Sequence, residues 1–123
     1  MTRLHYDKFH ETFGIKHQDS YLLCVNGKCF INGEVVDSKE LHDLVTKLKN
    51  ELESILSHLE EKFHLTIEDP LRIDLNPFCS VDTYFLSGRY DICHHDLELK
   101  ISEFISKHSD DLNTLLNEIT RWG

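Results

Sequence analysis

Residues 24–41, CVNGKCFINGEVVDSKEL, hold two turn signals and the start of a helix, and this stretch decides the fold. Asn-Gly stands at 26–27 and again at 32–33. This dipeptide is the strongest short hairpin signal, because both residues of the tight turn need positive φ. The segments around the two turns are therefore predicted to form a three-stranded antiparallel meander, with strands at 20–25, 28–31 and 34–36.

The segment after the meander has the periodicity of a long amphipathic helix, from Asp37 to about His64. Asp37 and Glu40 have the spacing of a capping box, with Asp in place of the usual Ser or Thr. The apolar stripe advances 22 residues in six steps, about 3.67 residues per turn, through Leu41, Val45, Leu48, Leu52, Leu56, Leu59 and Phe63. Because a coiled-coil seam advances 3.5 residues per turn, we expect this helix to pack on the protein's own sheet. A homodimer paired through residues 38–64 is the alternative.

The regions on either side of this helix mix strand and helix patterns. Residues 3–13 place aromatic side chains at helical spacing and end before Gly14, so a short helix is expected there. Residues 71–75 alternate like a strand between two proline-containing loops. A second hairpin is predicted from strands at 79–86 and 90–94, joined by a turn at 87–89.

The C-terminal third is predicted to form a pair of helices. Apolar residues from Leu97 to Ile105 lie on one helical face, with Asp96 as the expected cap. Ser109 is expected to cap a second helix over 110–122, with Trp122 on its core face. The sequence thus predicts an α+β fold in one globular domain, 1–123. Its small antiparallel sheet, built from the N-terminal meander and the second hairpin, would pack against the long helix and this C-terminal helical pair.

The charge of the chain is strongly acidic and uneven. Residues 1–36 carry four basic and four acidic side chains, so residues 37–123 hold the whole net charge of −9. Such a surface repels phosphate backbones, which argues against direct nucleic-acid binding, and it attracts a protein partner with a basic surface. The longest apolar run is five residues, 21–25, and the N-terminus lacks the apolar core of a signal peptide, so no membrane association and a cytoplasmic location are expected.

Two of the four cysteines flank the first Asn-Gly turn. A two-residue loop places Cys24 opposite Cys29, where a cross-strand disulfide is geometrically conceivable. In the reducing cytoplasm two packed thiols are the expected state. The spacing of the four cysteines lacks the Cys-x-x-Cys pairs of a structural zinc site.

The second hairpin contains the candidate catalytic and metal-binding residues. Its predicted register places Asp82 opposite His94, and a carboxylate there would orient the imidazole as a general base, with Ser80 or Cys79 as nucleophile. The candidate metal ligands are Cys79, Cys93, His94 and His95, with Asp82 or Asp91. Adjacent histidines on a strand point to opposite faces, which argues against one shared ion, and no cofactor is predicted.

The same hairpin also contains the candidate partner-binding residues, which are Tyr84, Arg89, Tyr90, Asp82 and Asp91. Tyrosine and arginine are the residue types that dominate interface hot spots, and the aspartates would supply an acidic rim. Because the chain lacks an assembled set of nucleophile, base and oxyanion donors, we expect binding rather than catalysis. The expected function is a small acidic inhibitor, of the immunity or phage-antagonist type, acting on a basic nuclease or nucleic-acid-handling complex. A small hydrolase or metal-dependent enzyme centred on Asp82, Cys93 and His94 is the alternative.

Overall fold

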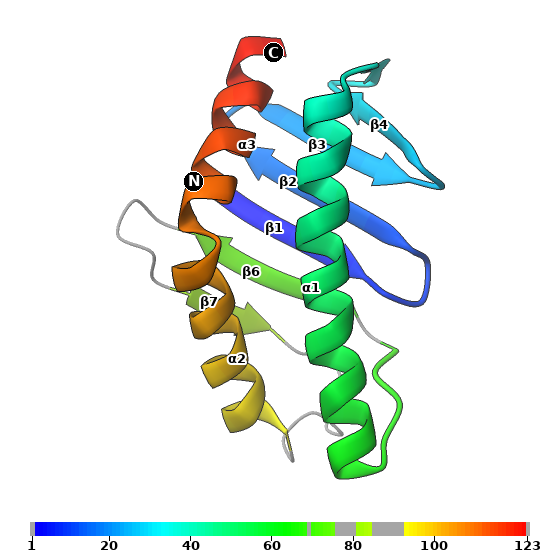
Figure 1. Ribbon diagram of the computed structural model, residues 1–123, viewed down its shortest axis with the longest axis vertical. Coiled ribbons are helices and arrows are strands. Elements are labelled where there is room, and N and C mark those ends of the chain that lie inside the picture. The colour runs from blue at the N-terminus through cyan, green and yellow to red at the C-terminus, as the bar shows by residue number, and fades with distance from the viewer. Residues whose placement is uncertain (1, 69, 76–80, 85–92, 123) are drawn as a thin grey trace.

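The computed structural model describes residues 2–68, 70–75, 81–84 and 93–122, with residues 81–84 described through their backbone. In these residues one antiparallel sheet and three helices form two layers, and the helices cover one face of the sheet (Figure 1). The α+β fold expected from the sequence is confirmed, including the long helix and the C-terminal helical pair.

The sheet has seven strands in the described residues: β1 (Thr2–Asp7), β2 (Thr12–His17), β3 (Ser20–Val25), β4 (Lys28–Ile31), β5 (Glu34–Val35), β6 (Leu71–Leu75) and β7 (Val81–Tyr84). Their order is β5-β4-β3-β2-β1-β6-β7, and each neighbouring pair is antiparallel. The first five strands form a continuous meander. Helix α1 then carries the chain over one face of the sheet, and β6 pairs with β1 on the other side of the meander (Figure 1).

Both predicted Asn-Gly turns are formed. The φ angles are 52° at Asn26, 76° at Gly27, 52° at Asn32 and 83° at Gly33, the left-handed values that these turns require. The side chain of Asn32 also accepts a hydrogen bond from the backbone N–H of Tyr21 at 3.0 Å, which ties the second turn to β3.

The predicted helix over 3–13 is wrong, because the chain forms the β1–β2 hairpin there. Tyr6 and Phe13 fit a helical spacing, but they are also the inward positions of two strands and are at most 1% exposed, whereas Phe9 between the strands is 70% exposed. Asp7 helps to form the turn, since its side chain accepts a hydrogen bond from the backbone N–H of His10 at 3.1 Å. Gly14, predicted to end the helix, lies within β2.

Helix α1 (Lys39–Phe63) follows the predicted stripe closely. Its N-cap is Ser38, whose side chain accepts a hydrogen bond from the backbone N–H of Leu41 at 3.3 Å, so the assignment of this role to Asp37 is wrong by one residue. The six stripe residues from Leu41 to Leu59 are at most 4% exposed. The helix therefore buries its apolar face along its whole length within its own chain.

The C-terminal helices are α2 (His94–Lys107) and α3 (Ser109–Trp122), which follow one another along one side of α1 (Figure 1). The predicted strand at 90–94 is wrong at its described end, because Cys93 is the N-cap of α2 and His94 its first residue. Asp96 therefore lies inside the first turn. The core position predicted for Trp122 is also wrong, since this last helical residue is 47% exposed and its indole N–H donates to Glu118 at 3.3 Å.

The core lies between the sheet and the helices. It is formed by inward residues of the strands, such as Leu4, Phe13 and Ile73, and by the facing sides of α1, α2 and α3. Within the described ranges, no helix combines the length and the apolar content needed to cross a bilayer.

Candidate interaction surfaces

The candidate partner-binding residues fall only partly within the described residues. Arg89, Tyr90 and Asp91 lie outside them, as does Cys79. Asp82 and Tyr84 lie on β7, the edge strand beyond β6, where their Cα partners are Asp74 and Arg72. This strand also lies against α2, so the sheet edge that contains Asp82 and Tyr84 adjoins the helical layer.

The predicted pairing of Asp82 with His94 depends on a returning strand, and His94 instead belongs to a helix. The Nε2 atom of His94 lies 2.8 Å from a carboxylate oxygen of Glu98, one turn along α2. Cys93 is fully buried, and this burial raises the pKa of its thiol. In the part of the chain that the structure describes, no three His, Cys, Asp or Glu residues form a group suited to a metal ion.

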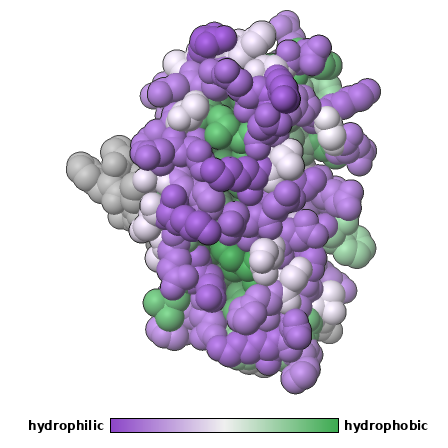
Figure 2. Space-filling view, in the orientation of Figure 1, coloured by the Kyte–Doolittle hydropathy of each residue, from purple (hydrophilic) through white to green (hydrophobic). Residues whose placement is uncertain are grey.

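The helices present an acidic layer, defined as the solvent-facing sides of α1, α2 and α3. Together the three helices contain 12 acidic and seven basic residues, a net charge of −5. Figure 2 shows this side of the molecule, which is largely hydrophilic, with apolar atoms visible in a seam between α1 and the α2–α3 pair. The core is therefore closed on this side by polar and charged side chains.

Three of the six lysines on these helices form ion pairs between helices. Lys47 on α1 lies 2.9 Å from Asp111 on α3, and Lys62 on α1 lies 2.5 Å from Asp96 on α2. Lys107 on α2 lies 3.4 Å from Glu51 on α1. By contrast, Asp43, Glu53 and Glu61 are exposed on α1 and form no ion pair with a described residue. The excess negative charge of the layer is therefore solvent-facing and uncompensated.

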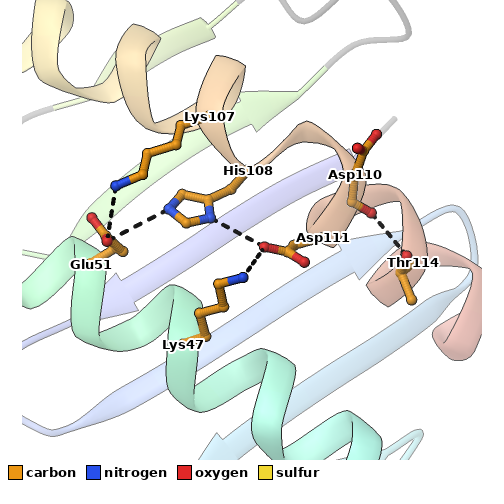
Figure 3. A network of polar contacts seen from close by, with 7 residues as sticks. All are labelled: Lys47, Glu51, Lys107, His108, Asp110, Asp111 and Thr114. Carbon is orange, nitrogen blue, oxygen red and sulfur yellow. Dashed lines mark hydrogen bonds and ion pairs between the residues drawn. The ribbon is translucent and has the colours of Figure 1, made fainter.

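The centre of the ion-pair network is His108, at the joint between α2 and α3 (Figure 3). Its Nδ1 atom lies 3.2 Å from Asp111, and its Nε2 atom lies 3.8 Å from Glu51. The pKa of the Asp111 carboxyl is lowered by its hydrogen bonds with Lys47 and with His108. Side chains from all three helices meet here, so the network holds the acidic layer together.

The geometry of this network favours a structural role. The His108 side chain is only 4% exposed, which leaves no room for a substrate. The two carboxylates lie at opposite nitrogens of the same ring, so they cannot bind one metal ion together with that ring (Figure 3).

The second surface is the open sheet face, the side of the sheet that no described helix covers. A row of neighbouring positions crosses it from His5 through Gly14, Leu23 and Phe30 to Val35. Val35 is 65% exposed, and Leu23 and Phe30 are half-buried. This end of the face, over β3, β4 and β5, is therefore an exposed apolar patch.

Tyr21 extends this patch across β2. A Cβ atom added to Gly14 would lie 2.8 Å from the Tyr21 hydroxyl oxygen, so the tyrosine ring occupies the space that a side chain at position 14 would need. Glycine fits this position because its missing side chain leaves room for the Tyr21 ring. It does not end a helix, contrary to the prediction from the sequence.

The opposite end of the open sheet face is polar and more basic than the acidic layer. Arg3 lies 2.5 Å from Asp74 across the β1–β6 pair, and Lys16 and Arg72 are exposed on the same face. Burial lowers the pKa of His5, and the neighbouring Arg72 guanidinium lowers it further. The two sides of the molecule therefore differ in charge.

Sequence reasoning missed both the His108 network and the open sheet face. The alternation of exposed and buried residues in 2–6, with Arg3 and His5 out and Leu4 and Tyr6 in, is the signal that indicates the extra strand. In comparisons with known proteins, no family model, curated protein or solved structure matches the chain.

Proposed function

We propose that this protein is a binding module whose acidic layer recognises a basic surface of a partner protein. The observation that carries the proposal is the uneven use of charge on the helices. Three of their six lysines pair with a carboxylate on a neighbouring helix, while carboxylates such as Asp43 and Glu61 face solvent without an ion-pair partner among the described residues. Uncompensated charge of one sign steers an oppositely charged partner and sets the register of docking.

The partner class that fits this chemistry is a basic nuclease or another protein of a nucleic-acid-handling complex. A small acidic protein placed on its positive cleft would compete with the phosphate backbone and act as an inhibitor, in the manner of an immunity protein or phage antagonist. The proposal includes a cytoplasmic location, because such nucleic-acid-handling complexes work there. Asp82 and Tyr84, on the neighbouring edge strand β7, are proposed as anchors, together with Arg89, Tyr90 and Asp91, which lie outside the described residues.

The experiment compares three baits in affinity capture from native lysate at low and high salt, read by mass spectrometry. The layer variant reverses three exposed charges on α1, Asp43→Lys, Glu53→Lys and Glu61→Lys. The matched control reverses three exposed charges on the sheet turns and edge, Glu11→Lys, Asp19→Lys and Glu34→Lys. Both variants change the net charge equally, so they separate the effect of this surface from the effect of total charge.

We expect the wild type and the matched control to capture the same basic protein, with less captured at high salt because screening weakens exposed charge pairs. The layer variant should lose that protein. Equal capture by all three baits, or loss with both variants, would contradict recognition through the acidic layer. Folding of each bait is checked by circular dichroism before capture.

A further inference from the structure

The β3–β4 hairpin holds two free thiols opposite each other. Cys24 and Cys29 are Cα partners one pair beyond Val25 and Lys28, which flank the Asn26-Gly27 turn, as the sequence predicts. Directly opposed residues in antiparallel strands have Cα atoms about 4.5–5.5 Å apart, which lies within the disulfide range of about 4.4–6.8 Å. The general backbone spacing of such a pair is therefore compatible with a disulfide.

The two thiols are not equivalent. The hydrogen bond between the side chains lowers the pKa of Cys29 and raises the pKa of Cys24. Burial raises the pKa of both thiols and the positive charge of Lys49 on α1 lowers both, so the hydrogen bond between them accounts for the difference. Because the thiolate is the nucleophilic form, Cys29 is the more reactive member of the pair.

An imidazole ring lies beside the Cys29 thiol. The Nδ1 atom of His42, in the first turns of α1, is 3.9 Å from the sulfur of Cys29. With its proton on Nε2, this imidazole accepts at Nδ1. Three groups from two strands and one helix thus converge: two thiols and an imidazole.

We propose that Cys29 and Cys24 are a redox-active pair, in which Cys29 attacks a small peroxide and Cys24 then closes an intramolecular disulfide, with His42 as proton acceptor. In the first step the sulfur of Cys29 attacks one peroxide oxygen and the O–O bond breaks. The thiol proton passes to His42 and then to the departing hydroxide, which leaves as water.

In the second step the sulfur of Cys24 attacks the sulfenic acid sulfur of Cys29. The S–S bond forms, the S–O bond breaks, and the hydroxyl group leaves with the Cys24 proton as a second water. Overall, two thiols lose two electrons and two protons to one peroxide, which is reduced to two waters.

The pair lies near an edge of the sheet, which suits a small oxidant. The neighbouring strand β5 pairs only with Phe30 and Ile31, and the backbone carbonyl of Cys29 is covered by one further hydrogen bond, from the N–H of Val36 at 2.9 Å. Because Cys24 is 7% and Cys29 2% exposed, a peroxide enters through local opening of this short edge, whereas a protein-sized oxidant is excluded.

The test uses the wild-type protein with hydrogen peroxide, followed by unfolding, alkylation and peptide mass spectrometry. We expect the peptide or peptides with Cys24 and Cys29 to lose about 2 Da as a disulfide forms, while Cys93 remains a thiol. Cys93 is the internal control, because it is fully buried and its pKa is raised.

Two variants test the assigned roles. In Cys24→Ser the sulfenic acid on Cys29 should accumulate and be trapped by dimedone, whereas Cys29→Ser should leave Cys24 unmodified. His42→Asn should slow disulfide formation roughly tenfold, in line with loss of the group that assists thiolate formation.

Oxidation of Cys29 no faster than that of Cys93, or a main product that links Cys79 or two copies of the chain, would overturn the proposal. This result comes from the wild type alone, so it stands even where a variant fails to fold.

Discussion

Both faces of the sheet carry large apolar residues, but these residues have different roles. Phe13 on β2 points to the helices and is fully buried, whereas Phe30 on β4 points to the open sheet face and is half-buried. The covered face stabilises the fold through its contacts with the apolar sides of α1, α2 and α3. The open face retains apolar surface that contributes little to folding. In a two-layer protein, an apolar residue on a strand is therefore not always in the core. Whether it is buried depends on which face of the sheet its position occupies.

The largest predicted effect separates these faces directly. Phe13→Ala should lower the free energy of unfolding by about 3–5 kcal/mol, because it opens a cavity between sheet and helices. Phe30→Ala is the matched change on the open face and should cost about 1 kcal/mol or less, since water already reaches this ring. Urea denaturation measures both. Similar losses in the two variants would mean that the open face is covered in solution.

The next prediction concerns the start of α1, on the covered side. Ser38→Ala removes the side-chain acceptor for the Leu41 N–H and should lower the free energy of unfolding by about 0.5–2 kcal/mol. Asp37→Ala, one residue earlier, is the control and should change stability by less than about 0.5 kcal/mol. Thermal and urea unfolding measure the stability of both variants. A larger loss in Asp37→Ala than in Ser38→Ala would show that Asp37 is the N-cap.

A pH-dependent contribution to the free energy of unfolding is expected at the β1–β2 turn. Burial alone would raise the pKa of Asp7, but hydrogen bonds from the ring and backbone of His10 outweigh it and lower the pKa below its usual value of 3.8. A carboxyl group with a lowered pKa in the folded state stabilises the protein above its unfolded-state pKa and loses this effect as pH falls.

The stability difference between wild type and Asp7→Asn should therefore be constant above about pH 5 and narrow as pH falls below 3.8. Urea denaturation at a series of pH values measures the difference. A stability difference that stays unchanged down to about pH 2.5 would show that the charge of Asp7 does not stabilise the fold.

The smallest effect is expected at the C-terminal end of α3. Trp122→Ala should change the free energy of unfolding by less than about 1 kcal/mol, because the ring is 47% exposed and follows the last buried residue of the helix, Ile119. Ile119→Ala on the same helix should cost about 2–5 kcal/mol. Comparable losses would place the tryptophan in the core after all.

The parts of the fold that the sequence predicts well are those decided by local chemistry. The turns at Asn26-Gly27 and Asn32-Gly33 need only residues that accept positive φ, and the stripe of α1 repeats over six turns. The β1–β2 hairpin was not predictable in the same way. Tyr6 and Phe13 fit both periods, and β1 is held by β6, whose Leu71 pairs with Tyr6 from 65 positions away.

The candidate sites were harder to predict for the same reason. Lys107 and His108 both meet Glu51 only because α1 packs beside the end of α2, and no spacing in the sequence predicts such contacts. The pairing of Asp82 with His94 assumed a strand where a helix begins. Only the opposition of Cys24 and Cys29 followed from the sequence, because one tight turn sets that register.

The central claim, that the acidic layer and not the open sheet face binds a basic partner, is tested most directly by nuclear magnetic resonance. Isotope-labelled protein is titrated with a lysine-rich peptide at low and high salt. The account predicts salt-sensitive shifts of backbone amides on the exposed side of α1, around Asp43 and Glu61, with Leu23 and Phe30 unchanged. Shifts concentrated on Leu23 and Phe30, or spread evenly over the molecule, would contradict it.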